Sequence, residues 1–199
     1  MGKQNLRTEC SGLEWGDFLL LIDKLKKEKE YRFLLFTAIG TYCGLRAGDI
    51  LNLRWIDVLN KTEIEIKEKK TAKVRHITMN QNLLDIINYC YEQITMKLGD
   101  GFREERYIFC NRNNGKLSIQ YINRKLHEIF RKSNSKMKVQ NPSTHTFRKT
   151  FGKRIYEMNG KSPESLVLLS QIFGHSSISI TRKYIGISQE QIQNVYTSL

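Results

Sequence analysis

The chain has 199 residues, of which 40% are hydrophobic and 10% aromatic, which is enough to bury a core and excludes a disordered segment. Thirty-three lysines and arginines against 20 acidic residues give a net charge of +13, and such a field favours a polyanionic partner. The sequence has no apolar run near the roughly 18 residues of a membrane-spanning helix. Nucleic acid is therefore favoured over a membrane, and a basic surface that only confers solubility is the simpler alternative.

Four cysteines are spread through the chain with no Cys-x-x-Cys pair and no signal peptide before them: Cys10, Cys43, Cys90 and Cys110. Three of them stand in apolar surroundings, where a thiol behaves as a small hydrophobic group. We expect a reduced, cytoplasmic protein without disulfides or structural zinc.

The first part of the chain predicts helices followed by a hairpin. Ser11 and Glu14 form a capping-box pattern ahead of a helix through DFLLLIDKL that ends in the charged KKEKE run. YRFLLFTAIGTYCG predicts a buried helix that stops near Gly44, and AGDILNLRWIDV predicts a further amphipathic helix. Near residues 62–79 apolar and charged residues alternate on both sides of an EKKTAK turn, which predicts a β-hairpin.

Helical spacing then returns through QNLLDIINYCYEQITMKL, while RYIFC predicts one short strand. Ser118 is expected to cap a helix through SIQYINRKLHEIFRKS, and THTFRKTFGKRIYEMNG predicts a helix stopped by Gly160. Pro163 opens the next helix. A short helix over SISITRKYI precedes a last one over IQNVYTSL, capped by Ser188 and Gln191. The expected fold is mainly α (α+β), a helical bundle with a small inserted antiparallel β-hairpin.

Five residues occur in an order that suits cleavage of a phosphodiester. Arg46 follows a buried helix, His145 and Arg148 lie three apart on one helix face, and His175 precedes Tyr184. Arginine stays protonated and binds two phosphate oxygens at once. A tyrosine phenol, with a pKa near 10, can attack a phosphate and later leave it. A lysine could protonate the departing 5′-oxygen.

Three stretches in this order resemble the boxes of tyrosine recombinases, the phage-integrase family. GLRAGDILNLRW resembles the first-arginine box, THTFRKTFGKRIYEMNG the His-x-x-Arg box, and LSQIFGHSSISITRKYIGI the box that carries the nucleophile. The resemblance extends from about Leu13 to the end of the chain. It implies a catalytic domain over residues 11–199, an N-terminal flank at residues 1–10 left from a linker, and a C-terminal helix at residues 189–199 that docks on a neighbouring subunit.

The resemblance also implies residue roles. Arg46 and Arg148 would clamp the scissile phosphate, His145 would exchange a proton near the nucleophile, and His175 would donate to a phosphate oxygen. Tyr184 would form a 3′-phosphotyrosyl link. Because one phosphoester replaces another, neither a cofactor nor a metal is expected.

Further residues are assigned from the same resemblance and from their surroundings. Lys70, in the hairpin turn, resembles the family's general acid, although the neighbouring turn lysines are alternatives. Asp49 is expected to orient an arginine. Contacts with DNA are expected from five residues: Lys69, Lys73, Lys149, Arg182 and Lys183.

The sequence departs from the family at two positions outside the core set: Phe147, a conservative packing change, stands where leucine is usual, and Lys149 stands where histidine is frequent. The residues before Ser11 are too few for the helical DNA-clamping domain of the family, so we expect a catalytic fragment or a minimal protein.

The expected function is that of an integrase of a mobile element, acting on double-stranded DNA, monomeric alone and tetrameric on DNA, in the cytoplasm and on the nucleoid when DNA-bound. A type IB topoisomerase and a non-catalytic DNA-binding regulator are the alternatives.

Overall fold

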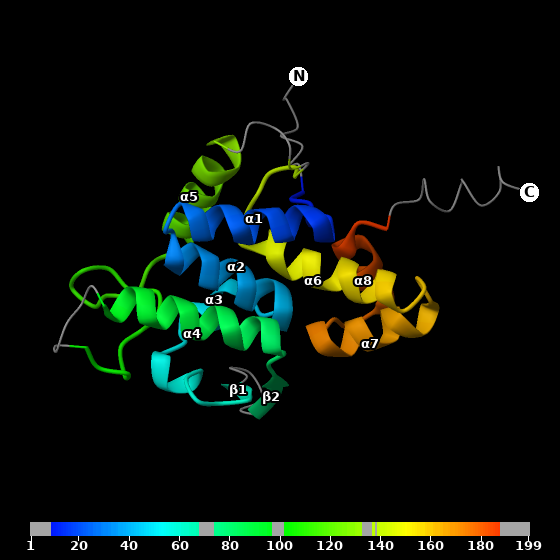
Figure 1. Cartoon of the computed structure of the whole chain (residues 1–199). Coiled ribbons are helices and arrows are strands. Elements are labelled where there is room, and N and C mark those ends of the chain that lie inside the picture. The colour runs from blue at the N-terminus through cyan, green and yellow to red at the C-terminus, as the bar shows by residue number, and fades with distance from the viewer. Residues whose placement is uncertain (1–8, 68–73, 97–101, 133–136, 138, 188–199) are drawn as a thin grey trace, which may run out of the picture.

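The computed structural model describes residues 9–67, 74–96, 102–132, 137 and 139–187 (Figure 1). The described elements are α1 (Trp15–Lys27), α2 (Tyr31–Cys43), α3 (Ala47–Ile50), a 3₁₀ turn η1 (Trp55–Asp57), β1 (Glu63–Lys67), β2 (Val74–Thr78), α4 (Gln81–Thr95), α5 (Ile119–Lys132), α6 (His145–Met158), α7 (Pro163–Phe173) and α8 (Ile178–Ile185). The mainly helical fold with a small hairpin is confirmed.

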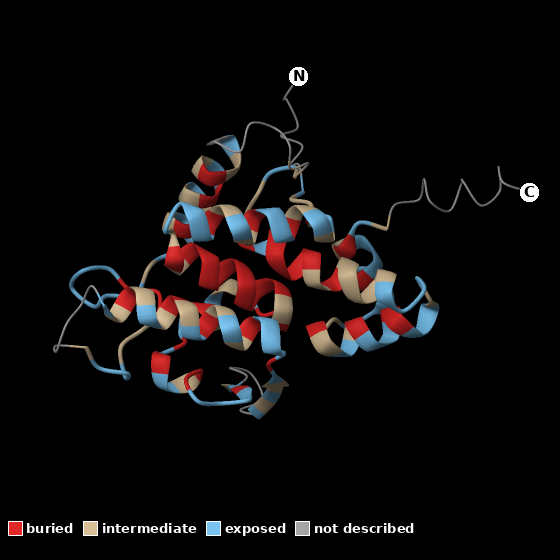
Figure 2. Ribbon diagram, viewed as in Figure 1, coloured by how far each residue is buried: buried red, intermediate tan, exposed pale blue. Residues whose placement is uncertain are grey.

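Helix α2 forms the centre of the domain. It is apolar around its whole circumference, as a helix buried on all sides must be, and Figure 2 shows it buried along nearly its entire length. Helices α1, α4 and α6 pack against it. Three helices therefore hold α2, the helix that ends just before Gly44 and Arg46.

A second, smaller apolar cluster lies apart from the main core. Its buried members come from α7 and α8: Leu166, Leu169, Phe173 and Ile185. Side chains from α6, Phe151 and Ile155 among them, pack against it, as does Tyr184 of α8. Helix α6 thus contributes to both clusters and connects the short helices α7 and α8 to the rest of the domain.

The hairpin is antiparallel, with Glu63 opposite Thr78 and Lys67 opposite Val74. Ile64 is fully buried and joins the main core, while its neighbours in β1 are exposed, which is the alternation that the sequence predicts. The connecting turn, including Lys69, Lys70 and Lys73, lies outside the described residues.

Glycines in the left-handed conformation end several helices. Gly44 ends α2 at φ 61° and Gly174 ends α7 at φ 61°, and this conformation suits glycine because it lacks a Cβ. Serines begin the next helices: Ser162 accepts a hydrogen bond from Ser165 N, and Ser177 accepts one from Ile180 N. The tight turns between these helices bring together the three sequence boxes, which are distant from one another along the chain.

Three predicted local features are wrong. Ser11 does not cap α1, because its hydroxyl accepts from Gln140 N instead, and α1 begins at Trp15. AGDILNLRWIDV divides into α3 and η1, because the Asp57 carboxylate accepts from Arg54 N and Trp55 N pairs with Arg106 O. RYIFC forms isolated bridges, not a strand. In the first two cases a partner distant in sequence overrides the local pattern.

Other predictions are confirmed. Ser118 accepts from Tyr121 N at the start of α5, and Gly160 adopts φ 64° after α6. The expected last helix, with Ser188 and Gln191, lies outside the described residues. Over the ranges that the structure covers, no helix has the length and apolarity needed to cross a membrane.

Replacing Gly44 with alanine should destabilise the protein more than replacing Gly160. Both glycines have left-handed φ values, which cost alanine about 1 kcal/mol. A Cβ at Gly44 would also approach the Phe151 ring to 2.6 Å, whereas nothing lies within 4 Å of one at Gly160. We expect a loss of about 3 kcal/mol for Gly44→Ala and about 1 kcal/mol for Gly160→Ala, measured by urea denaturation. Equal losses would contradict the close contact.

Candidate active site

Two arginines from different boxes bind one backbone oxygen. The Nη2 atoms of Arg46 and Arg148 donate to the Phe173 carbonyl, at 2.8 and 2.9 Å. Arg148 also donates through Nη1 to the carbonyl of Gly44. These carbonyls stand at the C-terminal ends of α7 and α2, where helix dipoles place partial negative charge and carbonyls lack helical partners. The helix ends therefore hold the guanidinium groups side by side.

Arg148 is a cation in an unfavourable place. The residue is only 4% exposed, and burial followed by repulsion from Arg46 lowers its pKa to about 10, although Tyr184 and Asp49 partly oppose this shift. Arg75 of β2 adds further positive charge. Within the described residues, neither Arg46 nor Arg148 forms an ion pair with a carboxylate. An anion that enters this site would relieve the repulsion.

Tyr184 lies against the same group of residues. Its hydroxyl is 3.4 Å from Nδ1 of His145, and its ring packs 5.4 Å from that of Phe173. Burial raises the pKa of the phenol to about 12, with Arg148 and Arg46 opposing the shift. The phenol is consequently protonated at neutral pH, and its proton would have to leave before its oxygen could act as a nucleophile.

Two neutral histidines flank the phenol. Burial, followed by the charges of Lys149, Arg148 and Arg46, lowers the pKa of His145, so its ring can accept a proton at neutral pH. Burial and the two arginines also lower the pKa of His175.

The ring of His175 is oriented by a hydroxyl on α8, the helix that carries Tyr184. Nδ1 of His175 lies 2.9 Å from Oγ1 of Thr181, a fully buried residue of α8. When Nδ1 accepts from this hydroxyl, the proton of the neutral ring is on Nε2, which becomes the donor for a ligand.

The remaining predicted residues are distributed around this centre. Lys149 is 8% exposed with its ammonium 5.1 Å from the centre of the Tyr184 ring, while Arg182 and Lys183 are exposed on α8. Asp49 lies close enough to raise the pKa of Arg148. The structure therefore brings the predicted residues of the three boxes together except Arg182, for which it shows only exposure on α8, and the three turn lysines lie outside its described part.

Three contributors were missed by sequence reasoning. The Phe173 carbonyl has no side-chain signature, so only the helix stop at Gly174 hinted at an unpaired oxygen. Thr181 stands inside the nucleophile's box, where a small polar residue among apolar ones was the available signal. Arg75 belongs to the alternating pattern that predicted β2, but that pattern does not show which face of the hairpin lies toward the site.

A cavity of about 310 Å³ opens beside Tyr184. Lys149, Lys153 and Lys183 line it together with residues 9–12. In the part of the chain that is described, no three His, Cys, Asp or Glu residues gather as a metal ion would require. The chemistry available here is that of cations, imidazoles and a phenol.

Sequence comparison identifies the protein family to which this fold and this arrangement of residues belong. The model of the phage integrase family matches residues 14–191, and the chain belongs to that family.

Among its curated relatives is the probable integrase/recombinase YoeC of Bacillus subtilis, 32% identical over 86% of this chain and 84% of YoeC. The tyrosine recombinase XerH of Campylobacter jejuni is 20% identical over 97% of this chain and 49% of XerH. The chain thus spans most of one relative and about half of the other.

Solved structures share the fold. XerA recombinase superposes with a TM-score of 0.69 at 21% identity, over 94% of this chain and 64% of XerA. XerH bound to a palindromic difH substrate after cleavage gives 0.68 at 18% identity, over 94% of this chain and 52% of XerH. These names favour a recombinase over the topoisomerase and regulator alternatives.

Two histidines with lowered pKa values, His145 and His175, should make stability depend on pH. Their pKa values in the folded protein lie below the unfolded value of about 6.5, so the unfolded state binds protons first as pH falls. The free energy of unfolding should therefore decrease from pH 7 to 5. His145→Asn should reduce this slope in urea denaturation, with His127→Asn, on the exposed side of α5, as control. An unchanged slope for His145→Asn would contradict a lowered pKa of its imidazole.

Proposed function

We propose that residues 11–199 form the catalytic domain of a site-specific DNA recombinase, with residues 1–10 as its flank. It cuts and rejoins DNA through a 3′-phosphotyrosyl intermediate, in the integration or excision of a mobile element. The observation that carries this proposal is the pair Arg46 and Arg148, bound to one carbonyl oxygen beside the Tyr184 phenol. A phosphodiester supplies the negative charge that this pair lacks.

The arginines bind the non-bridging oxygens of the scissile phosphate. Because Gly44 and Phe173 carbonyls already orient the guanidinium groups, little reorganisation is needed as charge develops on the phosphorus. Nε2 of His175 donates to one of the same oxygens.

The Tyr184 oxygen forms a bond to phosphorus while the bond to the 5′-oxygen breaks. Its proton passes to Nδ1 of neutral His145, which is 3.4 Å away. The departing 5′-oxygen takes a proton from Lys70. In the second step a 5′-hydroxyl of a partner strand attacks the phosphotyrosine and gives its proton to the now neutral Lys70 amine. The phenol leaves with a proton returned from His145.

The net charge of +13 and the basic residues of α6 and α8 support double-stranded DNA as the partner. Lys149, Arg182 and Lys183 contact its backbone, as do the turn lysines Lys69 and Lys73. The solved relatives include XerH bound to a difH substrate and a lambda integrase dimer bound to a core site, which supports this assignment.

Strand exchange requires a tetramer on two duplexes, formed from monomers, with residues 189–199 docking on the neighbouring subunit. The protein works in the cytoplasm and associates with the nucleoid when it binds DNA.

Covalent trapping tests the nucleophile. The full chain is incubated with nicked suicide duplexes from a randomised pool and run on a denaturing gel. The wild type should give a protein–DNA adduct, and Tyr184→Phe should give none because it lacks the attacking oxygen. Arg148→Lys should slow adduct formation by about 10²–10³-fold, because the forked donor is lost. Tyr156→Phe, on α6, is the matched control. An adduct that survives Tyr184→Phe would contradict the proposal.

A modified substrate tests the general acid. If Lys70 protonates the 5′-oxygen, Lys70→Ala should abolish cleavage of normal DNA. Cleavage should recover when that oxygen is replaced by sulfur, because a thiolate leaves without a proton. Lys69→Ala and Lys73→Ala should cleave normal DNA. If Lys69→Ala or Lys73→Ala, and not Lys70→Ala, fails on normal DNA and cleaves the sulfur-substituted DNA, that lysine is the general acid.

A further inference from the structure

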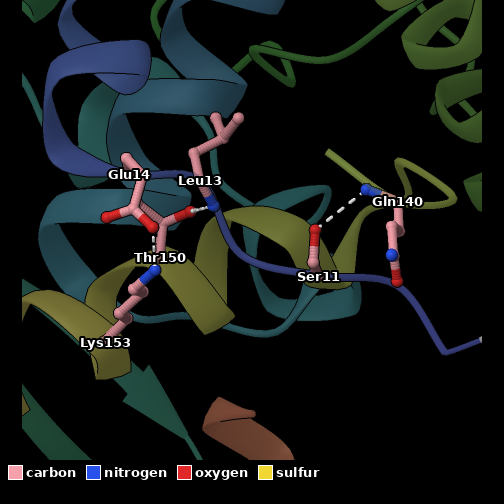
Figure 3. Close-up of polar contacts among 6 residues, drawn as sticks. All are labelled: Ser11, Leu13, Glu14, Gln140, Thr150 and Lys153. Atoms are coloured by element: carbon pink, nitrogen blue, oxygen red, sulfur yellow. Dashed lines mark hydrogen bonds and ion pairs between the residues drawn. The ribbon is translucent and has the colours of Figure 1, made fainter. Parts of the chain in front are cut away.

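An extended segment, residues 9–14, crosses α6 next to the active site, and we call it the N-terminal strap (Figure 3). Ser11 forms two hydrogen bonds with Gln140. The Ser11 nitrogen donates to the Gln140 carbonyl oxygen at 3.0 Å, and the Ser11 Oγ accepts from the Gln140 nitrogen at 2.9 Å. The next residues attach to α6, where Leu13 N donates to Oγ1 of Thr150 at 2.9 Å. The strap is thereby connected to two separate parts of the domain.

The strap lies directly on the helix backbone. A Cβ at Gly12 would stand 2.9 Å from the Thr150 nitrogen and 3.0 Å from the Lys149 carbonyl carbon, so only glycine fits without a shift. Leu13 is buried in the main core, and Glu14 pairs with Lys153. Residues 11–14 are therefore fixed relative to α6.

The outer end of the strap carries a carboxylate to the edge of the active site. Oε2 of Glu9 lies 3.9 Å from Nζ of Lys149, and Oε1 lies 3.7 Å from Nζ of Lys183. Lys149 follows Arg148 on α6, and Lys183 precedes Tyr184 on α8. One carboxylate thus bridges the two helices that carry the phosphate clamp and the nucleophile, over the cavity beside Tyr184.

The two lysines differ in their need for a counter-ion. The side chain of Lys149 is only 10% exposed, and a cation removed from water requires a compensating charge. Among the described residues, the carboxylate that pairs with it is that of Glu9. Lys183, with 79% of its side chain exposed, is well solvated.

Glu9 itself is a replaceable partner. Its side chain is 59% exposed, both of its contacts are long, and exposed pairs of this geometry are weak. A DNA phosphate accepts charge-assisted hydrogen bonds from lysine at shorter range. A phosphate that reaches the two lysines would therefore exchange with the carboxylate.

We propose that Glu9 is an autoinhibitory substitute for a backbone phosphate of DNA. In the free protein its carboxylate neutralises Lys149 and Lys183. When DNA binds, a phosphodiester next to the scissile one takes both lysines, and the outer end of the strap is released. This inference rests on the proposed function, in which these lysines contact DNA.

The exchange has a consequence for the response to salt. Lysines already neutralised by a protein carboxylate release few bound anions when DNA arrives, and the displaced carboxylate takes up a cation. Removing the carboxylate should therefore make binding tighter and more salt-dependent.

The test measures binding of a fluorescent random-sequence duplex by anisotropy across a salt series. Glu9→Gln should bind roughly two- to five-fold more tightly at low salt, the size of effect expected for losing an exposed competing pair. The slope of log affinity against log salt should steepen by up to about one. Glu28→Gln is the matched control, because it removes a carboxylate, 45% exposed against 59% for Glu9, from a 3.8 Å pair with Lys24 at the far end of α1.

A second background separates a local exchange from a general change in net charge. In Lys183→Gln the gain from Glu9→Gln should shrink, because one of the two competing contacts is absent. A gain of the same size in both backgrounds, or in Glu28→Gln, would overturn the proposal. So would an affinity for Glu9→Gln equal to that of the wild type.

Adduct formation distinguishes this inference from the proposed function. In single-turnover trapping, Glu9→Gln should lower the half-saturating DNA concentration and leave the maximal rate unchanged. A wild type that forms the Tyr184 adduct, together with a Glu9→Gln variant of unaltered DNA dependence, would overturn only the role of Glu9. A wild type that neither binds nor traps any duplex would overturn the proposed function and this inference with it.

Discussion

The active site depends on one carbonyl oxygen, that of Phe173. It accepts a hydrogen bond from Arg46 and another from Arg148, and so it joins the turn after α2, the body of α6 and the end of α7. Two guanidinium groups repel each other, and a neutral oxygen at a helix end offsets that repulsion without cancelling either charge. The pair remains available for an anion because a carbonyl, and not a carboxylate, orients it.

The charge of this pair determines the protonation states around it. Both histidines are neutral because burial and the nearby arginines disfavour their imidazolium forms. The same arginines moderate the rise in the pKa of the Tyr184 phenol that burial causes. A proton acceptor and a proton donor are therefore present together at neutral pH, and the arriving phosphate alters both through the arginines it neutralises.

Much of this arrangement could be predicted from the sequence because it is encoded locally. Glycine stops such as Gly44 and serine caps such as Ser118 were sufficient for most of the helices, and the resemblance of the three boxes indicated which side chains would gather. The division of AGDILNLRWIDV and the use of Ser11 by Gln140 depended on partners far away in the chain. The role of the Phe173 oxygen could not be predicted, because every residue has a backbone carbonyl and the sequence does not distinguish one from another.

The small apolar cluster of α7 and α8 gives the domain two levels of cohesion. Its buried members come from those two helices, whereas α2 and its neighbours share a much larger core. Small cooperative units open more readily than the global fold. Opening of α7 and α8 would remove the phenol, the His175 ring and the oxygen that joins the arginines in a single event, while the main core persisted. The completeness of the candidate site thus depends on a small unit of the domain as well as on its main core.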